Sequence, residues 1–110
     1  MVESALSRGE EINGKTTRSS PEQIVDVVCK YYQVGKRLIM GDSRARQVAR
    51  PRQMVMYLLR TKLGIPYEEV GRLVGGRDHS TVMHAVDKIT ELAAANVHIR
   101  EDMLKIKSAL

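Results

Sequence analysis

Apolar positions recur at helical spacing along the chain from residue 20 onward. The first such face repeats at i, i+3, i+4 and i+7 and consists of Ile24, Val27, Val28 and Tyr31. Ser20 stands before this face as an N-cap, Pro21 takes the first helical position, and Gln23 completes a capping box. We therefore predict a helix that begins at Ser20 and Pro21 and is ended by Gly35.

The same period predicts further helices as far as the C-terminus. They are expected over residues 36–40, 48–63, 66–74 and 78–95, followed by a last amphipathic helix with Ile99, Met103, Ile106 and Leu110 on one face. Pro51 fits its helix only in the first turn, where no internal N–H bond is lost. No segment is a candidate strand, so the predicted fold class is all-α, with about six helices.

Length and composition limit the class of protein. Residues 9–20 are polar and without periodicity, so we expect 1–19 to be a flexible tail or linker and 20–110 to be one domain. A chain of 110 residues is too short for a large enzyme. No apolar run nears the ~18 residues of a membrane span, and no signal peptide is visible. The single Cys29 excludes an intrachain disulfide and fits a reducing, cytoplasmic compartment.

Positive charge is concentrated in one quarter of the chain. The net charge is +5, yet residues 36–62 alone carry +7 and the remainder carries −2. Such a stretch is either a solvated basic face or a phosphate-binding surface. Arginine favours bidentate recognition of phosphate, and the unpaired N–H groups of a helix N-terminus attract anions. Because Arg46, Arg50 and Arg52 crowd a predicted loop and helix start, we assign them to phosphate.

The helices predicted at 66–74 and 78–95, joined by a glycine-containing turn, have the order of a helix-turn-helix. In such motifs the second helix enters the major groove of DNA, and its N-terminal residues meet base edges. The outward side chains at this end include Asp78, His79, Ser80 and Met83. We assign these four to base reading, Met83 through a thymine methyl group. Arg77, directly before them, is assigned to phosphate.

Residues 75–85, Gly-Gly-Arg-Asp-His-Ser-Thr-Val-Met-His-Ala, resemble the signature of the C-terminal DNA-binding domain of the bacterial replication initiator DnaA. Upstream, residues 44–53, Arg-Ala-Arg-Gln-Val-Ala-Arg-Pro-Arg-Gln, are similar to that domain's basic loop and following helix. The similarity covers roughly residues 20–110, with no gap between the two segments. It implies a six-helix domain that binds the short, asymmetric DnaA boxes at the chromosomal origin.

The resemblance also implies a role for each residue that matches by position. Arg44 matches the basic-loop arginine that enters the minor groove of DNA in this family. A narrow minor groove has a stronger negative potential, which attracts a cationic side chain. Asp78, His79 and Ser80 match the base-reading triplet, in which the family usually has threonine in place of Ser80. The residues that match the backbone-contacting set are Arg52, Gln53, Arg60, Thr81, His84 and Lys88.

Two further patterns are rejected. Residues 9–16 match the Walker A pattern, but no buried strand precedes them, so we attribute the match to chance. His79 and His84 are five positions apart, ~140° around a helix, and share no ligand face for zinc. We expect no metal, no catalysis and no cofactor in this chain. ATP is expected only if a separate ATPase domain belongs to the intact protein.

Sequence-specific binding of double-stranded DNA at DnaA-box-like sites is therefore the leading hypothesis. We expect a monomeric, nucleoid-associated domain in the bacterial cytoplasm, with replication-regulatory proteins as candidate partners. Two alternatives stay open: a stand-alone helix-turn-helix transcription regulator, and a basic protein-interaction module that meets an acidic regulator.

Overall fold

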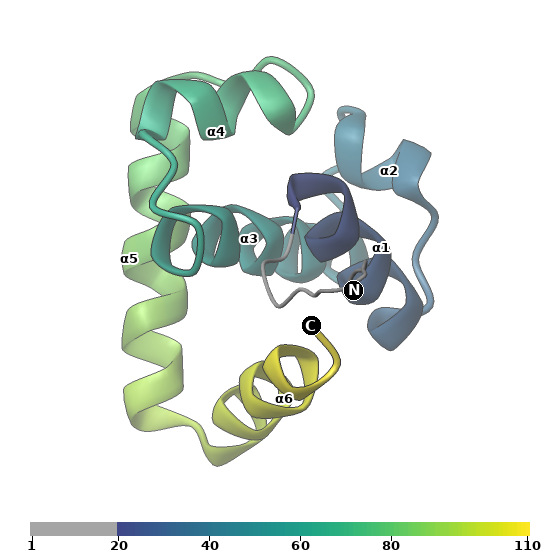
Figure 1. Ribbon diagram of the computed structural model, residues 1–110, viewed down its shortest axis with the longest axis vertical. Helices are drawn as coiled ribbons and strands as arrows, with labels where there is room; N and C mark the ends of the chain where they lie inside the picture. The colour runs from purple at the N-terminus through teal and green to yellow at the C-terminus, as the bar shows by residue number, and fades with distance from the viewer. Residues whose placement is uncertain (1–19) are drawn as a thin grey trace, which may run out of the picture.

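Six α-helices and no strand make up residues 20–110, the part of the chain that the computed structural model describes. They are α1 (Pro21–Tyr32), α2 (Lys36–Met40), α3 (Arg46–Thr61), α4 (Tyr67–Leu73), α5 (His79–Ala95) and α6 (Val97–Ser108) (Figure 1). The all-α prediction is confirmed. The tail predicted at 1–19 and the Walker A pattern at 9–16 lie outside the described residues.

α1 begins after the predicted Ser20 N-cap, but it ends before Gly35. Gln33 adopts the left-handed conformation at the end of the helix, with φ 57°, and Gly35 is instead the N-cap of α2. The chain turns at Gln33 because Val34 packs against the core, and the Val34 N–H donates to the Cys29 carbonyl at 3.0 Å. The prediction that Gly35 ends the first helix is therefore wrong.

α3 begins at Arg46, two residues earlier than predicted. Pro51 consequently lies in the second turn, and the prediction that it must occupy the first turn is wrong. Its ring nitrogen carries no hydrogen for the Gln47 carbonyl, so the helix lacks one internal bond. Five apolar side chains that follow in α3 are at most 2% exposed, and their burial outweighs the missing bond.

α3 lies at the centre of the hydrophobic core. It buries Met54, Val55, Met56, Leu58 and Leu59, and α5 packs beside it with Val82, Ala85, Val86 and Ile89. Burial of a large aliphatic side chain contributes roughly 1.5–3 kcal/mol, so this contact fixes how α5 lies against α3. In Figure 1, α5 runs along one edge of the molecule, with α4 across one end and α6 leaving from the other.

Two neighbouring tyrosines connect α1 to α6. The Tyr31 hydroxyl donates to Asp102 Oδ1 at 2.6 Å, and the Tyr32 hydroxyl donates to Asp102 Oδ2 at 3.3 Å. The hydrogen bond to Asp102 raises the pKa of Tyr31 to about 12. Burial, followed by the charge of Asp102, raises the pKa of Tyr32 as well. The carboxylate thus holds both hydroxyls in their protonated form and links the first and last helices.

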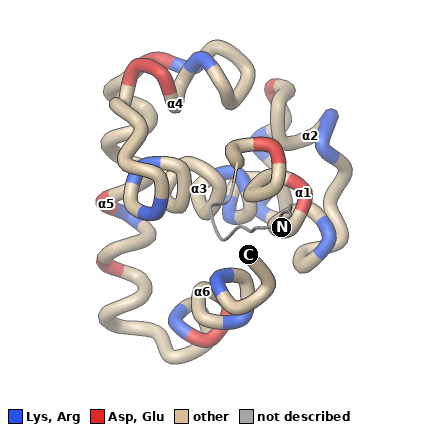
Figure 2. The backbone as a smooth tube through the Cα atoms, in the orientation of Figure 1, with Lys and Arg blue, Asp and Glu red and all other residues tan. Residues whose placement is uncertain are grey.

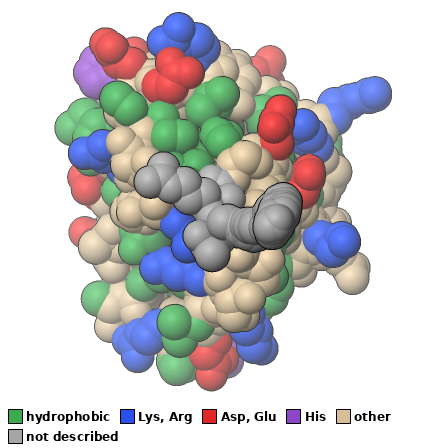
Figure 3. Space-filling model, viewed as in Figure 1, with side chains coloured by type: hydrophobic (Ala, Val, Ile, Leu, Met, Phe, Trp, Pro, Cys, Tyr) green, Lys and Arg blue, Asp and Glu red, His purple; other side chains and the backbone are tan. Residues whose placement is uncertain are grey.

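The face seen in Figure 3 mixes charges of both signs. Lysine and arginine alternate there with aspartate and glutamate, and hydrophobic side chains lie between them. Such mixed charge is typical of a solvated surface. Within residues 20–110, none of the helices has the length and apolar character needed to cross a membrane.

Candidate nucleic-acid interface

α4 and α5 form a helix-turn-helix whose turn depends on closely packed backbone. The Arg77 N–H donates to the Gly71 carbonyl at 2.7 Å, and a Cβ on Gly71 would overlap the Arg77 carbonyl. Gly75 and Gly76 both have positive φ, +79° and +74°. These contacts bring residue 77 back onto α4 and set the direction in which α5 leaves the turn.

The side chains predicted to read bases lie on the exposed first turn of α5. Asp78 has the backbone conformation of an N-cap, but its carboxylate makes no capping hydrogen bond. The Asp78 and His79 side chains are 69% and 51% exposed, with Oδ1 and Nδ1 3.7 Å apart. Ser80 is exposed, and Met83, one turn along, is 40% exposed. This end of the helix therefore presents hydrogen-bonding groups to solvent.

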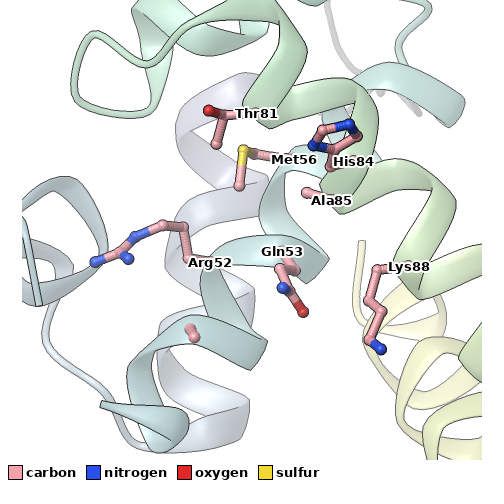
Figure 4. A pocket seen from close by; sticks show the side chains of 8 residues that line it. Arg52, Gln53, Met56, Thr81, His84, Ala85 and Lys88 are labelled. Carbon is pink, nitrogen blue, oxygen red and sulfur yellow. The ribbon is translucent and has the colours of Figure 1, made fainter. Parts of the chain in front are cut away.

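Beside these residues, a pocket of about 360 Å³ lies between α3 and α5. Its lining residues are Ala49, Arg52, Gln53, Met56, Thr81, His84, Ala85 and Lys88 (Figure 4). Thr81, His84 and Lys88 recur at helical spacing along α5, and Gln53 extends from α3 into the gap that separates the two helices. We call this pocket the α3–α5 groove.

Five residues of the predicted phosphate set line the α3–α5 groove, namely Arg52, Gln53, Thr81, His84 and Lys88, although the Arg52 guanidinium donates to main-chain carbonyls outside the groove. Sequence reasoning missed the small and apolar residues that shape the groove. Ala49 and Met56 share one face of α3 with Gln53, and Ala85 lies between Thr81 and Lys88 on α5. The sequence did contain a signal for these groove residues. Ala49 precedes Gln53 by four positions and Ala85 follows Thr81 by four positions, so each alanine lies on the same helix face as a polar groove residue.

The predicted basic loop leads from α2 into α3 and keeps its arginines at the surface. Arg44 is exposed in the loop, and Arg46 is exposed at the first position of α3. Arg50 is half-buried, and its Nη1 donates to Gln53 Oε1 at 3.4 Å. This bond connects the loop side of α3 to the groove. Figure 2 shows the resulting run of lysine and arginine along α2 and α3.

Arg60 lies away from the α3–α5 groove, near the end of α3. Its guanidinium carbon is 4.7 Å from the centre of the Tyr67 ring, a cation–π contact with the first residue of α4. Its Nη1 also donates to the Ile65 carbonyl at 3.4 Å. These contacts hold the half-buried Arg60 guanidinium beside the start of α4, the first helix of the helix-turn-helix.

Arg52 and Arg77 have surroundings that differ from those expected of phosphate ligands. Arg52 is only 9% exposed, and in Figure 4 its side chain extends away from Gln53 and Lys88. Its three nitrogens donate to carbonyls of residues 38–43, and Arg77 Nη2 donates to two of the same carbonyls. Burial, and then the charge of Arg77, lowers the pKa of Arg52 below its usual value. We therefore do not carry the predicted phosphate role of these two residues forward.

The histidines of the described residues pair at most with one carboxylate each: His79 Nδ1 lies 3.7 Å from Asp78 Oδ1, and His98 Nδ1 lies 4.0 Å from Glu101 Oε1. Among residues 20–110, no three His, Cys, Asp or Glu side chains come together in a way that holds a metal ion. Cys29 is half-buried beside the core, and burial raises the pKa of its thiol.

Comparison with known proteins identifies the family. The sequence model of a family described as "Bacterial dnaA protein helix-turn-helix" matches residues 21–89. The chromosomal replication initiator protein DnaA of Thermomicrobium roseum is 40% identical over 91 residues, which cover 83% of this chain and 20% of that protein. The protein of the same name from Brucella abortus is 34% identical over 109 residues, covering 94% and 22% respectively.

The chain spans about a fifth of the length of the curated relatives that it matches. A third relative, the chromosomal replication initiator protein DnaA of Rhizobium meliloti, is 39% identical over 94 residues and gives the same picture, with 20% of its length covered. The matched part is the DNA-binding module, which is not catalytic. The chain therefore belongs to the bacterial DnaA family, as its DNA-binding helix-turn-helix domain.

Proposed function

We propose that this chain binds double-stranded DNA sequence-specifically at DnaA-box-like sites of a bacterial replication origin. The observation that carries the proposal is the juxtaposition of two features on α5. Exposed hydrogen-bonding side chains occupy its first turn, and a groove with polar and cationic walls runs directly beside them. The first feature suits base edges and the second suits the sugar–phosphate backbone next to them.

Base reading takes place in the major groove at the start of α5. The Asp78 carboxylate accepts no capping bond, so its oxygens are available to the amino group of cytosine or adenine. The His79 ring is half exposed and presents a donor and an acceptor. Ser80 adds a hydroxyl without the methyl group of the family's usual threonine. Met83 supplies an apolar contact for a thymine methyl group.

Phosphate contacts then set the register of α5 on the duplex. The groove residues Gln53, Thr81, His84 and Lys88 bind one stretch of backbone. Arg46, Arg50 and Arg60 neutralise further phosphates along α3, with counterion release as the driving force. Arg44 reaches from the basic loop into the minor groove, where a narrow groove strengthens the negative potential.

In this proposal the domain binds an asymmetric DNA site as a monomer and is associated with the nucleoid. It needs no cofactor of its own, because base edges and phosphates are bound by side chains alone. Because the chain spans about a fifth of its relatives, ATP binding is proposed only for a separate domain of an intact initiator. Replication-regulatory proteins are proposed partners of the intact protein.

A titration with two duplexes tests the proposal. One duplex contains a DnaA box, and the other has the same bases in scrambled order. Fluorescence anisotropy at 50 and 200 mM salt gives the dissociation constant of each. We expect the box to bind more tightly at both salt concentrations, with affinity for both duplexes falling as salt rises. Equal affinity for the two duplexes at every salt concentration refutes box reading.

A further inference from the structure

Two guanidinium groups converge on the segment that ends α2 and starts the basic loop. Arg52 Nε donates to the Ile39 carbonyl at 2.8 Å, and Arg52 Nη1 donates to the Ser43 carbonyl at 2.8 Å. Arg52 Nη2 donates to the carbonyls of Leu38 and Gly41, at 2.8 and 3.1 Å. The acceptors bracket the chain on both sides of residue 42, directly ahead of Arg44.

Arg77 reaches the same segment from the turn of the helix-turn-helix. Its Nη2 donates to the Ile39 carbonyl at 3.2 Å and also to the Gly41 carbonyl. Its Nε is buried and has no hydrogen-bond partner within the described residues. Arg77 therefore acts on the loop through a single terminal nitrogen, while Arg52 uses all three of its nitrogens.

The turn also contacts this segment through its backbone. A Cβ on Gly75 would overlap the Met40 carbonyl, so the two main chains are in direct contact. The Arg77 N–H is meanwhile bonded to Gly71 in α4. The end of α2, the basic loop and the turn before α5 are thus connected by two arginines and one glycine contact.

The proximity of the Arg52 and Arg77 guanidinium groups is electrostatically unfavourable, because both carry positive charge. Two like charges share carbonyl acceptors, and neither guanidinium has a carboxylate bonded to it within residues 20–110. Buried charges of this kind are retained where several hydrogen bonds satisfy them. Here the six bonds from the two side chains all end on main-chain carbonyls at the start of the basic loop. The arrangement fixes backbone position rather than presenting charge to a ligand.

We propose that Arg52 and Arg77 are positioning residues, which hold the basic loop in register with the recognition helix so that Arg44 and the first turn of α5 engage one DNA site together. The proposal rests on the proposed function, because it assigns how two parts of that DNA site are aligned. Arg52 fixes the loop itself, and Arg77 transmits the position of the turn to the loop.

The two arginines are predicted to respond differently to lysine. Arg77 uses one terminal nitrogen, and its Nε contributes no bond, so Arg77→Lys retains a donor and loses only reach. Arg52→Lys replaces three donating nitrogens by one and leaves carbonyls without their partner. We expect Arg77→Lys to recover most of the box affinity that Arg77→Gln loses, whereas Arg52→Lys recovers little.

A double-mutant cycle on DNA binding tests the proposal. Box affinity is measured for the full chain, for Arg44→Ala, for Arg77→Gln and for the double variant. We expect each single change to weaken box binding by ~5–100-fold, and the double variant to be no more than ~3-fold weaker than the worse single variant, because both changes remove the same minor-groove contact. The matched cycle of Arg77→Gln with His79→Ala is expected to be closer to additive.

Controls separate positioning from other roles. Arg72, 73% exposed on α4, supplies a matched change: Arg72→Gln is expected to leave box affinity within ~2-fold. Urea denaturation of each variant shows that it is folded at the assay temperature, and Arg77→Met, which keeps a long side chain but has no donor, takes the place of Arg77→Gln if the latter is not. Additive effects of Arg44→Ala and Arg77→Gln overturn the proposal. Equal weakening of box and scrambled duplexes by Arg77→Gln, with a salt slope shallower by about 0.9, indicates a direct phosphate contact and also overturns it.

The same data distinguish failure of this inference from failure of the proposed function. If the unmodified chain binds box and scrambled duplexes equally, box reading fails and this inference fails with it. If the chain prefers the box but the cycle is additive, the proposed function stands and the positioning role alone is wrong.

Discussion

Replacing Gly75 with alanine probes how closely the turn of the helix-turn-helix contacts the end of α2. Gly75 has φ +79°, and a Cβ built on it overlaps the Met40 carbonyl. Gly76 is a matched control, because its φ is +74° and a Cβ there meets nothing within 4 Å. The two substitutions therefore share the conformational cost and differ only in the overlap.

The expected magnitudes follow from this difference. An L-residue in the left-handed region costs about 1–2 kcal/mol, which is the whole expected effect of Gly76→Ala on the free energy of unfolding. Gly75→Ala adds a forced shift of main chain, for which overpacking data give roughly 1–3 kcal/mol. In a domain of about this size, each kcal/mol lowers Tm by roughly 4–8 °C.

Thermal and urea denaturation followed by circular dichroism at 222 nm measure both variants. We expect Gly75→Ala to be less stable than Gly76→Ala by roughly 1–3 kcal/mol, and to lose box affinity as the turn moves away from the basic loop. Equal stabilities of the two variants would refute the contact between Gly75 and Met40 as a source of tight docking.

Three other changes give independent checks. Asp102→Asn removes the carboxylate whose hydrogen bond raises the pKa of Tyr31 to about 12. Because protonated Tyr31 is favoured in the folded state, the resulting stabilisation is present below about pH 10 and is lost as the pH rises to about 12. Urea denaturation of the variant should show a shallower loss of stability over this pH range, and an unchanged pH profile would contradict the contact. Ser20→Ala should lower the free energy of unfolding by about 1 kcal/mol through loss of the N-cap bond to Gln23, and no change would show that the cap is unimportant. Arg60→Ala should weaken box and scrambled duplexes alike and make the slope of log affinity against log salt shallower by about 0.9, whereas a loss confined to the box would assign Arg60 to base reading.

Much of the fold could be predicted from the sequence because local signals and burial agree. The Ser20 cap, the apolar face of α1 and the glycine turn before α5 are each encoded within a few neighbouring residues. The sequence predicts the end of α1 at Gly35, but the helix ends earlier because Val34 packs against the core. This tertiary contact makes Gln33, rather than Gly35, adopt the left-handed conformation. The position of Pro51 within α3 was predicted wrongly because local rules disfavour the loss of a main-chain hydrogen bond inside a helix. Here the burial of apolar side chains along α3 compensates for that lost bond.

The residues of the candidate site could be predicted where their side chains are exposed, but not where a side chain hydrogen-bonds to main-chain carbonyls of the protein itself. Thr81, His84 and Lys88 have helical spacing, and the structure brings them to one groove with Gln53. Arg52 lies in the same basic stretch, yet it donates to carbonyls of residues 38–43. Nothing in residue type distinguishes an arginine that faces phosphate from one that faces a helix end, because both anions and carbonyl groups attract guanidinium.

The most direct test of the central claim is the ratio of box affinity to scrambled affinity before and after the change His79→Ala, with Lys88→Gln as a control on the same helix. Base reading by the first turn of α5 predicts that His79→Ala reduces this ratio by ~5–150-fold, while Lys88→Gln weakens both duplexes and leaves the ratio within about 2-fold. A ratio that His79→Ala leaves unchanged would contradict the claim that this turn reads the DNA sequence.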